Sequence, residues 1–368
     1  MNFSIDRSPL LDALQNVQSV VEKKNTIPIL GNILCSVKNQ ELSLCATDLE
    51  VGIKVNLPIE SQQDGKITLS AKHFLEIVKE LPDKKLYFTS KDNSWVELVC
   101  GKSRFNIVSL PADQYPSFPD FEDKTYFESR TDVLLNMIDR TQFATSNDAT
   151  RYHINGVFLE HLENSIMRMT ATDGHRLSFV DNEVFLTNPE IKRGIIIPKK
   201  GLTEFRKLLE EGNSTLGLAF ERGYVFAKFS NSHLFIRLID GEYPDYRPVI
   251  PKAVDRSIKL DRQTFNSALK RVSLLANEKS RGVKLSLQEG LLTISSSNPD
   301  MGEAREEIDV EYVGESMEIG FNSKYLLECL SVMKSEKLEF QLKDRLSPGI
   351  LRELNQQNHT YVIMPMRI

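Results

Sequence analysis

The sequence lacks the features that mark secreted, membrane and zinc-binding proteins. Asp6 and Arg7 interrupt the amino-terminal stretch where a secretory signal needs an unbroken apolar core. No apolar run reaches the roughly 18 residues that a membrane-spanning helix requires. The chain has only four cysteines, with no CxxC pair and no histidine at zinc-ligand spacing. We therefore expect a cytoplasmic protein without a membrane partner, whose cysteines act as small core residues.

Motifs of the common enzyme classes are also missing. The sequence contains no GxSxG, GxGxxG, GxxxxGK[ST] or HExxH pattern. One cluster, Asp173-Gly174-His175-Arg176, has the residue types of an acid, a base and an anion-binding group. A related Ala-Thr-Asp stands at Ala46–Asp48, which favours a repeated structural turn over a catalytic site. We predict no enzyme activity, no catalytic residues, no metal and no cofactor.

Positive charge is in short supply as well. The 368 residues carry a formal net charge of −5, which argues against tight nucleic-acid binding, because such binding is mainly phosphate neutralisation by Lys and Arg. The expected helical segments are nevertheless more positive than the rest of the chain. This distribution permits a basic helical face on an acidic protein. The alternative is that Lys and Arg favour helices in any protein.

A weak threefold repeat near 125 residues organises the chain. Each copy opens with a strand-like segment followed by apolar positions at helical spacing, beginning at Phe3, Phe127 and Ile258. Short alternating or apolar stretches such as LSLCAT, WVELVC and LFIRLI fill the remainder and indicate antiparallel strands. The prediction is an α+β fold of three similar domains, each with two helices packed on antiparallel sheets, over residues 1–125, 126–252 and 253–368.

A second strand-and-helix unit follows in each copy. Ser70, Pro198 and Asn322 align at its helix start, where a capping Ser or Asn or an initiating Pro is favoured. The six expected helical segments are 8–24, 72–80, 131–151, 199–211, 262–281 and 324–337.

Two proline-rich connectors separate the repeats. The first runs from Pro111 to Lys124 and the second from Asp240 to Asp255, and both contain a Tyr-Pro pair. Proline restricts the backbone, so we expect domains held at fixed mutual angles.

Several segments resemble the bacterial DNA polymerase III beta subunit, the sliding clamp family and a replication processivity factor. They are TIPILGN from Thr26, ATDLE from Ala46, RYHINGV from Arg151, ATDGHRLS from Ala171, DGEYPDYRPV from Asp240, NEKSRGVKL from Asn277, MEIGFN from Met317 and the terminal YVIMPMRI. The resemblance covers the whole chain in order. It implies the DNA clamp fold, in which a head-to-tail homodimer forms a ring of six domains around duplex DNA.

Size is consistent with such a ring. A domain of this length corresponds to a sphere about 36 Å across, and six touching spheres leave a hole about as wide. Three or four spheres leave a hole narrower than a duplex about 20 Å wide. The resemblance implies tethering of the replicative polymerase, the clamp loader and other proteins that carry a short clamp-binding peptide. Without a nucleotide-binding motif, ATP-driven loading would need a separate protein.

The resemblance also supplies site residues. Those expected near DNA are Lys24, Lys79, Arg151, Tyr152, His153, Lys199, Lys200 and Lys207. Those expected in a hydrophobic groove for the partner peptide are Ile154, Thr172, Gly174, His175, Arg176, Leu177, Pro244, Arg247, Pro248, Val249, Leu346, Val362, Met364, Pro365, Met366 and Arg367. Those expected at the dimer interface are His73, Ile77, Phe105, Ile107, Leu274, Leu275, Glu303 and Glu306.

One position departs from the family pattern. The family often has two consecutive arginines where this chain has Arg247-Pro248, which puts the peptide preference of that wall in doubt. A further alternative is a peptide-binding scaffold that uses the groove without encircling DNA. The self-association state at low micromolar concentration separates the two.

Overall fold

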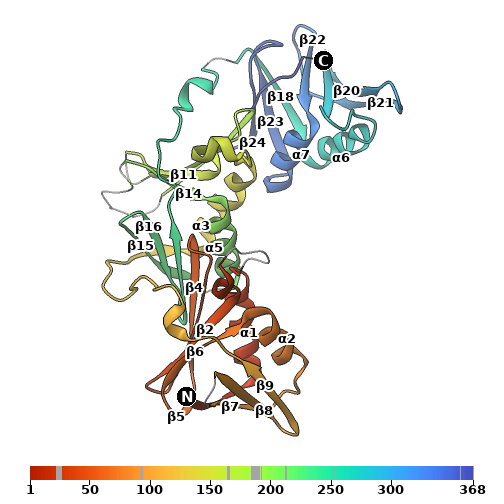
Figure 1. Ribbon diagram of the computed structural model, residues 1–368. Coiled ribbons are helices and arrows are strands. Elements are labelled where there is room, and N and C mark those ends of the chain that lie inside the picture. The colour runs from red at the N-terminus through yellow and green to blue at the C-terminus, as the bar shows by residue number, and fades with distance from the viewer. Residues whose placement is uncertain are drawn as a thin grey trace. The chain divides into compact units, whose positions relative to one another are not determined.

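The computed structural model describes all residues except 22–26, 92–93, 164–165, 184–190, 192, 212–213, 253, 357 and 368. Helices and antiparallel strands alternate along the chain (Figure 1). The α-helices are α1 (Arg7–Gln18), α2 (Ala71–Glu80), α3 (Thr131–Thr141), α5 (Lys199–Glu211), α6 (Arg262–Ser273) and α7 (Ser323–Val332). The 3-10 helices are η1 (Pro28–Gly31), η2 (Ala112–Gln114), η3 (Gln142–Ala144), η4 (Ala149–Ile154) and η5 (Arg247–Val249).

The strands fall into three successive groups. Before α3 they are β1 (Asn2–Asp6), β2 (Asn32–Lys38), β3 (Glu41–Thr47), β4 (Val51–Pro58), β5 (Glu60–Gln63), β6 (Gly65–Ser70), β7 (Lys85–Lys91), β8 (Trp95–Cys100), β9 (Ser103–Val108) and β10 (Phe127–Arg130). The middle group is β11 (Gly156–His161), β12 (Ile166–Thr172), β13 (Arg176–Glu183), β14 (Ile195–Pro198), β15 (Thr215–Glu221), β16 (Tyr224–Lys228) and β17 (Ser232–Arg237). The last group is β18 (Arg256–Asp261), β19 (Gly282–Gln288), β20 (Leu291–Asn298), β21 (Gly302–Asp309), β22 (Met317–Asn322), β23 (Lys337–Leu342), β24 (Gly349–Glu353) and β25 (His359–Ile363).

The chain divides into two compact units. Unit 1 comprises Met1–Leu134 and Lys200–Leu238, and unit 2 comprises Leu135–Lys199 and Ile239–Ile368. The middle part of the chain contributes to both, because α3 and α5 each cross a unit boundary. The predicted mixture of helices and antiparallel sheets is confirmed.

Each unit contains one long and one short sheet. In unit 1 the strand orders are β10-β15-β16-β17-β4-β3-β2-β6 and β5-β1-β7-β8-β9. In unit 2 they are β14-β11-β12-β13-β25-β24-β23-β18 and β21-β20-β19-β22. Each long sheet therefore joins strands from two successive repeats.

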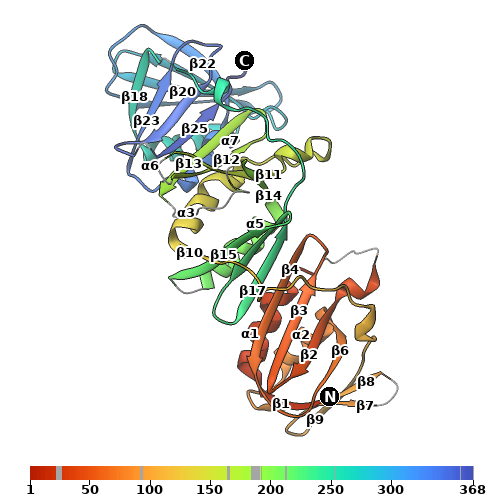
Figure 2. The same ribbon diagram turned by 90° about the vertical axis from the view of Figure 1, so that its left-hand side faces the viewer.

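The two junctions inside the long sheets use the same pairing. At the first joint, in unit 1, β4 pairs antiparallel with β17 (Figure 2). At the second joint, in unit 2, β13 pairs antiparallel with β25. Val51 faces Ile236 at the first joint, and Arg176 faces Ile363 at the second. A backbone bond closes each pairing at the same place, Arg237 N–H to Glu50 O at 2.7 Å and Met364 N–H to His175 O at 2.9 Å.

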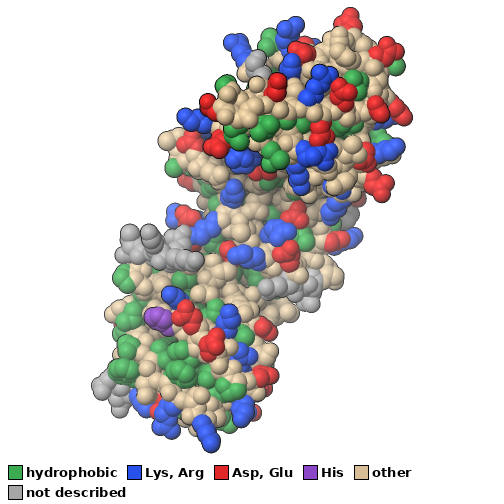
Figure 3. All heavy atoms as spheres, turned by 90° about the vertical axis from the view of Figure 1, so that its right-hand side faces the viewer, with side chains coloured by type: hydrophobic (Ala, Val, Ile, Leu, Met, Phe, Trp, Pro, Cys, Tyr) green, Lys and Arg blue, Asp and Glu red, His purple; other side chains and the backbone are tan. Residues whose placement is uncertain are grey.

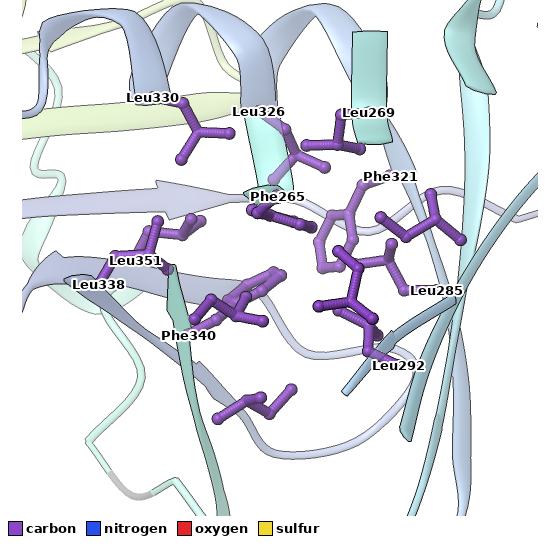
Figure 4. Close-up of a cluster of buried hydrophobic side chains, with 14 of the residues drawn as sticks. Phe265, Leu269, Leu285, Leu292, Phe321, Leu326, Leu330, Leu338, Phe340 and Leu351 are labelled. Carbon is purple, nitrogen blue, oxygen red and sulfur yellow. The ribbon is translucent and has the colours of Figure 1, made fainter. Parts of the chain in front are cut away.

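The core of the third repeat shows how helices and sheets combine. Phe265 and Leu269 of α6 and Leu326 and Leu330 of α7 point toward strand residues such as Phe340 (Figure 4). All five side chains are buried. Each fully buried side chain of this kind contributes about 1.5–3 kcal/mol of transfer free energy. The period-3.6 apolar pattern that predicted these helices is therefore the pattern of their buried faces.

Helix starts agree only partly with the predicted caps. The Asn322 side chain accepts the Lys324 backbone N–H at 2.9 Å, as a capping Asn should. Pro198 directly precedes α5. Ser70 stands at the start of α2 but makes no side-chain capping bond, so the prediction of a Ser cap was wrong. Asp261 caps α6 instead by accepting the Thr264 N–H at 2.7 Å.

Four predicted helices, α1, α3, α6 and α7, end earlier than expected, and at the first three short polar side chains compete for the backbone. The segment 131–151 is not one helix: α3 ends at Thr141, whose hydroxyl donates to Met137 O at 2.7 Å, and η3 and η4 follow. At the end of α1, the Ser19 hydroxyl donates to Asn16 O at 2.8 Å. Beyond α6, the Asn277 side chain accepts the N–H groups of Lys279 and Ser280.

Candidate functional site

The turn from Thr172 to Arg176 builds one side of the candidate site. The Thr172 hydroxyl donates to Arg176 O at 2.6 Å and accepts the Gly174 N–H at 3.1 Å. The Asp173 carboxylate accepts the N–H groups of His175 and Arg176 at 3.0 and 3.1 Å. Gly174 has a φ of +89°, a conformation that glycine adopts without steric cost. Asp173 thus serves its own turn and is not paired with the His175 ring.

The same turn occurs at the first joint. The Thr47 hydroxyl donates to Val51 O at 2.8 Å and accepts the Leu49 N–H at 3.0 Å. The Asp48 carboxylate accepts the N–H groups of Glu50 and Val51 at 2.9 and 2.7 Å. The prediction of a repeated structural turn is confirmed. Leu49 stands where the second copy has Gly174 and holds a φ of +80°.

Arg176 anchors the second turn to the third repeat. Its guanidinium donates to Asp173 at 3.1 Å and to Phe143 O at 2.7 Å, and it pairs with Glu328 of α7. It also lies 4.5 Å from the centre of the Tyr325 ring. Arg176 is only 8% exposed, and these contacts satisfy its charge within unit 2.

A pocket opens beside this turn at the second joint. Its volume is about 170 Å³. Its floor comes from the facing residues Leu177 of β13 and Val362 of β25. Its remaining lining consists of Thr172, Gly174, Arg176, Pro244, Asp245, Tyr246, Val249 and Met364. Val249 and Met364 are 43% and 38% exposed, so an apolar surface remains open at the mouth.

The connector after β17 forms the opposite wall. Tyr243 stacks on Phe158 of β11, with ring centres 4.8 Å apart. Tyr246 packs with Leu177, Phe179 and Val362 in a buried cluster. A strand pair and a proline-stiffened connector therefore enclose the pocket.

The pocket gathers eight of the predicted groove residues. These are Thr172, Gly174, Arg176, Leu177, Pro244, Val249, Val362 and Met364. The other predicted residues do not line it: Ile154, His175, Arg247, Pro248, Leu346, Pro365, Met366 and Arg367. Ile154 is buried, whereas Leu346 is 70% exposed. Met366 instead forms an isolated β-bridge with Gly320.

Two lining residues were missing from the predicted set, Asp245 and Tyr246. A signal for Tyr246 was available in the sequence. The connectors share the spacing Tyr115, Phe118, Phe121 and Tyr243, Tyr246, Val249. An aromatic residue three positions after the Tyr of each Tyr-Pro pair therefore recurs at both joints.

The residues predicted near DNA are mostly engaged in local contacts. Lys24 lies outside the described residues. Lys200 pairs with the buried Asp48, and Lys207 pairs with Glu204 at 2.8 Å. Lys199 donates to Asn147 Oδ1 at 3.0 Å. Lys79 is exposed on α2.

Near the second joint, Tyr152 is 55% exposed and His153 is half-buried. Arg151 pairs with Asp148 at 3.1 Å. Its Nη1 also lies 2.9 Å from the position that a Cβ on Gly174 would take. Arg151 therefore reaches the mouth of the pocket.

The predicted interface residues lie on the edge strands of the two short sheets, on α2 and just after α6. Phe105 and Ile107 belong to β9, and His73 and Ile77 lie on α2. In unit 2, Leu274 follows α6 and is 73% exposed, with the half-buried Leu275 next to it. Glu303 and Glu306 belong to β21, and Glu306 pairs with Arg271.

A buried charged cluster links α3 to the last strands of unit 2. Arg140, 4% exposed, pairs with Glu353, 2% exposed, beside the buried His359. Burial lowers the pKa of His359 to about 4, and Arg140 adds to this effect. Burial opposes ionisation of Glu353, but His359, the Ser335 and Lys334 N–H groups and Arg140 together lower its pKa to about 2. We therefore treat His359 as neutral and Glu353 as ionised near neutral pH.

Reactive groups are scarce in the part of the chain that the structure describes. Its four cysteines are buried, and burial raises the pKa of Cys45 to about 12. No described group of three or more His, Cys, Asp or Glu residues could hold a metal ion. Among the described helices, none is long and apolar enough to cross a membrane.

Three models of one family match the chain in succession. They describe the N-terminal, central and C-terminal domains of the DNA polymerase III beta subunit and match residues 1–119, 128–245 and 247–367. The chain belongs to the DNA polymerase III beta subunit family. The function of this family is that of a DNA sliding clamp, a non-catalytic processivity factor in DNA replication, and the chain has that function.

Individual relatives agree along the whole length. The beta sliding clamp of Pseudomonas aeruginosa is 37% identical over 369 residues, which cover 100% of both chains. A crystal structure of the P. aeruginosa sliding clamp bound to griselimycin superposes with a TM-score of 0.94 at 36% identity. A structure of the Caulobacter crescentus clamp, with polyethylene glycol at its putative beta-motif tethering region, gives 0.93 at 36% identity. Both structures cover 100% of this chain and are covered completely by it.

Proposed function

We propose that two copies of the chain join head to tail into a ring around duplex DNA, and that client proteins bind by a short peptide in the second-joint pocket. In this proposal each chain supplies three domains, 1–125, 126–252 and 253–368. The observation that carries the ring is the repeated strand pairing of the two internal joints. At each joint, the last of three successive strands in one repeat (β4 or β13) pairs with the final strand of the next repeat (β17 or β25).

Residues that face one another across each sheet show which strands are equivalent in the three repeats. The facing series Phe3-Phe88-Leu98-Phe105, Phe127-Leu218-Ala227-Leu234 and Ile258-Phe340-Leu351-Tyr361 cross corresponding strands of the three repeats. They make β9 the counterpart of β17 and β25. The series Leu34-Cys45-Lys54, Phe158-Thr170-Phe179 and Lys284-Ser295-Arg305 make β21 the counterpart of β4 and β13.

Both remaining counterparts lie at sheet edges. β9 ends the short sheet of unit 1, and β21 ends the short sheet of unit 2. Unpaired strand edges tend to pair with another chain. The pairing of β9 with β21 of a second copy repeats the internal joints, and two such contacts close a symmetric pair of chains.

Apolar exposure supports the same edges. Figure 3 shows hydrophobic side chains gathered on the surface of unit 1, on the side that carries α2 and β9. Phe105 is 36% exposed, whereas its counterparts Leu234 and Tyr361 are buried at the internal joints. Leu274 occupies the position after α6 that Ser19 and Phe143 occupy near the ends of α1 and α3. Leu274 and Phe105 are thus the apolar residues that a second copy would cover.

The internal joints also give the expected register. Ile53 faces Leu234 and Ser178 faces Tyr361. The counterparts of these residues are Ala304 and Phe105, so we expect Phe105 to face Ala304 of the second copy. Asn106 should then face Glu303, on the outer surface of the joined sheet. Side chains of His73, Ile77, Ile107, Leu275 and Glu306 would lie at or beside the same contact.

Weak attraction to DNA fits this arrangement. Lys200 and Lys207 are each paired with a carboxylate, which limits how strongly they neutralise phosphate. Tight phosphate contacts would make binding strongly salt-dependent and would slow sliding. Lys24, Lys79, Arg151, Tyr152, His153 and Lys199 complete the proposed DNA-facing set.

The pocket suits a short apolar peptide. Leu177, Val249, Val362 and Met364 present apolar surface in a small concave site, and methionine adapts to different partners. We propose that the replicative polymerase, the clamp loader and other clients share it. The griselimycin complex of the P. aeruginosa clamp makes that compound a suitable probe for this chain.

Cysteine crosslinking tests the ring. Asn106→Cys with Glu303→Cys places two thiols on directly facing residues, within the separation that a disulfide spans. Because the four native cysteines are buried, oxidation should convert this variant into covalent dimers at low micromolar concentration. Each single variant should remain uncrosslinked.

A register control sharpens the result. Phe105→Cys with Glu303→Cys puts the thiols on opposite faces of the joined sheet, so it should crosslink far less. Equal crosslinking of both pairs, or a native chain that sediments as a monomer, would contradict the proposed contact. A monomer that still binds griselimycin would indicate a peptide-binding scaffold instead.

A further inference from the structure

The wall of the second-joint pocket contains an aromatic ring that a cavity leaves unsupported on one side. Tyr246 packs against Leu177, Phe179 and Val362, but it also lines the open pocket. A side chain with a void on one side lacks packing partners there. The ring therefore needs another means of holding its position.

A buried carboxylate supplies that means. Glu160 of β11 is 8% exposed and accepts a hydrogen bond from the Tyr246 hydroxyl. Its second oxygen accepts from Arg247 Nη2 at 3.2 Å. One buried side chain thus holds two successive connector residues, Tyr246 in the wall and Arg247 beside it.

Two further charged groups complete the contact. Arg168 Nη1 donates to the Tyr246 hydroxyl at 3.3 Å. Its Nε and Nη2 donate to the two oxygens of Asp181, both at 2.6 Å. The Arg168 guanidinium also lies 4.3 Å from the centre of the Phe179 ring. Charged hydrogen bonds of this kind fix geometry more firmly than neutral ones.

The equivalent positions at the first joint carry uncharged side chains. Phe118 occupies the position of Tyr246 and packs edge-on against Phe235, with ring centres 5.4 Å apart. Ser36 stands in place of Glu160, and Ser43 and Asn56 stand in place of Arg168 and Asp181, with one neutral bond of 2.7 Å between them. At these three positions, charged side chains thus accompany the open pocket, and uncharged ones accompany the joint that aromatic side chains fill.

We infer that Glu160 is a positioning residue of the peptide pocket, acting through the Tyr246 hydroxyl without touching the ligand. This inference rests on the proposed function of the pocket. Removal of the carboxylate should let the Tyr246 ring and Arg247 move, and so weaken ligands that need the preformed wall.

The test is a double-mutant cycle on the full chain with griselimycin as the probe. Glu160→Gln and Tyr246→Phe should each weaken binding about tenfold, in line with the loss of a hydrogen bond to a charged group. Because both changes abolish the same charge-assisted contact, Glu160→Gln by removing the charge and Tyr246→Phe by removing the donor, the double variant should be little weaker than the single ones. NMR of ring-labelled tyrosine should show that the Tyr246 ring flips faster in the Glu160→Gln variant than in the native chain.

Tyr115→Phe is the matched control. The Tyr115 hydroxyl donates to Asn32 O and accepts the Thr47 N–H, both at 3.2 Å, at the first joint. Its loss should lower the melting temperature without changing the griselimycin Kd.

Three results would overturn the inference. They are Kd values within twofold of the native chain, additive losses in the double variant, and an equal loss of affinity in Tyr115→Phe. A native chain that fails to bind griselimycin would instead count against the pocket itself, and the inference would fall with it.

Discussion

The two internal joints have the same backbone pairing but differ in the side chains that pack over it. Both pair a strand that follows a Thr-Asp turn with the last strand of the next half-sheet, in the same register. At the first joint Phe121 is 5% exposed and packs on Phe226 and Phe235. At the second joint its counterpart in the connector, Val249, is 43% exposed and lines a pocket.

The difference shows how a repeated fold acquires a pocket at one joint and not at the other. The backbone pairing supplies a joint in either case, and side-chain volume decides whether the joint is filled. Phe235 covers Gly52 so closely that a Cβ there would lie 2.1 Å from the ring. At the second joint Leu177 and Val362 occupy these positions and leave space. The pocket therefore reflects different side chains on a shared frame, with Val249 in the connector where the first joint has the larger Phe121.

The largest expected effect concerns the charged cluster found at the second joint. Arg140→Met should destabilise unit 2 by roughly 3–5 kcal/mol, because it leaves the Glu353 charge buried and unpaired. At the first joint, Ser19→Ala removes a hydroxyl that contacts Glu204 and Asn16 O and should cost about 1 kcal/mol. Urea unfolding measures both. Adding Glu353→Gln to Arg140→Met should recover much of the loss, and equal costs at the two joints would refute the distinction.

Acid should weaken the same cluster. Because the folded pKa of His359, about 4, lies below its ordinary value of 6.5, the unfolded state binds the proton first. The folding stability that the neutral His359 contributes, roughly 3 kcal/mol, is fully present above pH 6.5 and is lost as the pH falls through 4. Glu353 adds a further loss below its ordinary value of 4.5, toward pH 2.

Unfolding measured between pH 7 and pH 4 checks this expectation. His359→Gln should flatten the dependence in that range. A stability that stays constant between pH 6.5 and 4 in the native chain would be inconsistent with a buried neutral histidine.

Phe121 and Val249 pack over the two joints, so exchanging these residue types should exchange the properties of the joints. Phe121→Val should cost about 2 kcal/mol by leaving a cavity in the aromatic cluster. Val249→Phe should change stability by no more than about 0.5 kcal/mol, since the site is half-open, but should abolish griselimycin binding by filling the pocket. Thermal unfolding and binding isotherms measure the pair. Undiminished binding by Val249→Phe would place the ligand elsewhere.

The two turns should give the smallest effects. Gly174→Ala should cost about 1 kcal/mol, because φ is positive there. A Cβ at this position would also displace Arg151. Leu49→Gly relieves a side chain held at positive φ while adding backbone freedom to the unfolded chain, so the two terms should nearly cancel. Unfolding free energies compare the variants, and a larger cost for Leu49→Gly than for Gly174→Ala would reverse this ranking.

Much of the fold could be predicted from the sequence, because apolar periodicity records which faces are buried. The helix starts near Arg7, Lys199 and Arg262 agree with prediction to within a residue or two. The ends of α2 and α5 also agree, but α1, α3 and α6 end early, where Ser19, Thr141 and Asn277 form local hydrogen bonds that no periodicity reveals. The pairing of strands from different repeats was also beyond sequence patterns, because register depends on contacts between distant segments.

The site was recovered in part for related reasons. Resemblance supplied eight of the ten residues that line the pocket, including Leu177 and Val362 from strands far apart in the chain. It could not show that Arg176 is held internally by Glu328, or that Glu160 lies beneath Tyr246. The group with which a buried charged side chain pairs depends on the packed structure and not on the local sequence. The lysines predicted near DNA illustrate this, since Lys200 is paired with a buried Asp48.

Retention on DNA of defined topology tests the ring most directly. The chain is loaded on nicked circular DNA by its clamp loader with ATP, and the DNA is then cut once. A sliding ring should stay on the circle at high salt and leave soon after linearisation, unless the ends are blocked. Retention on linear DNA with free ends, or loss from the intact circle at the same rate, would contradict encirclement.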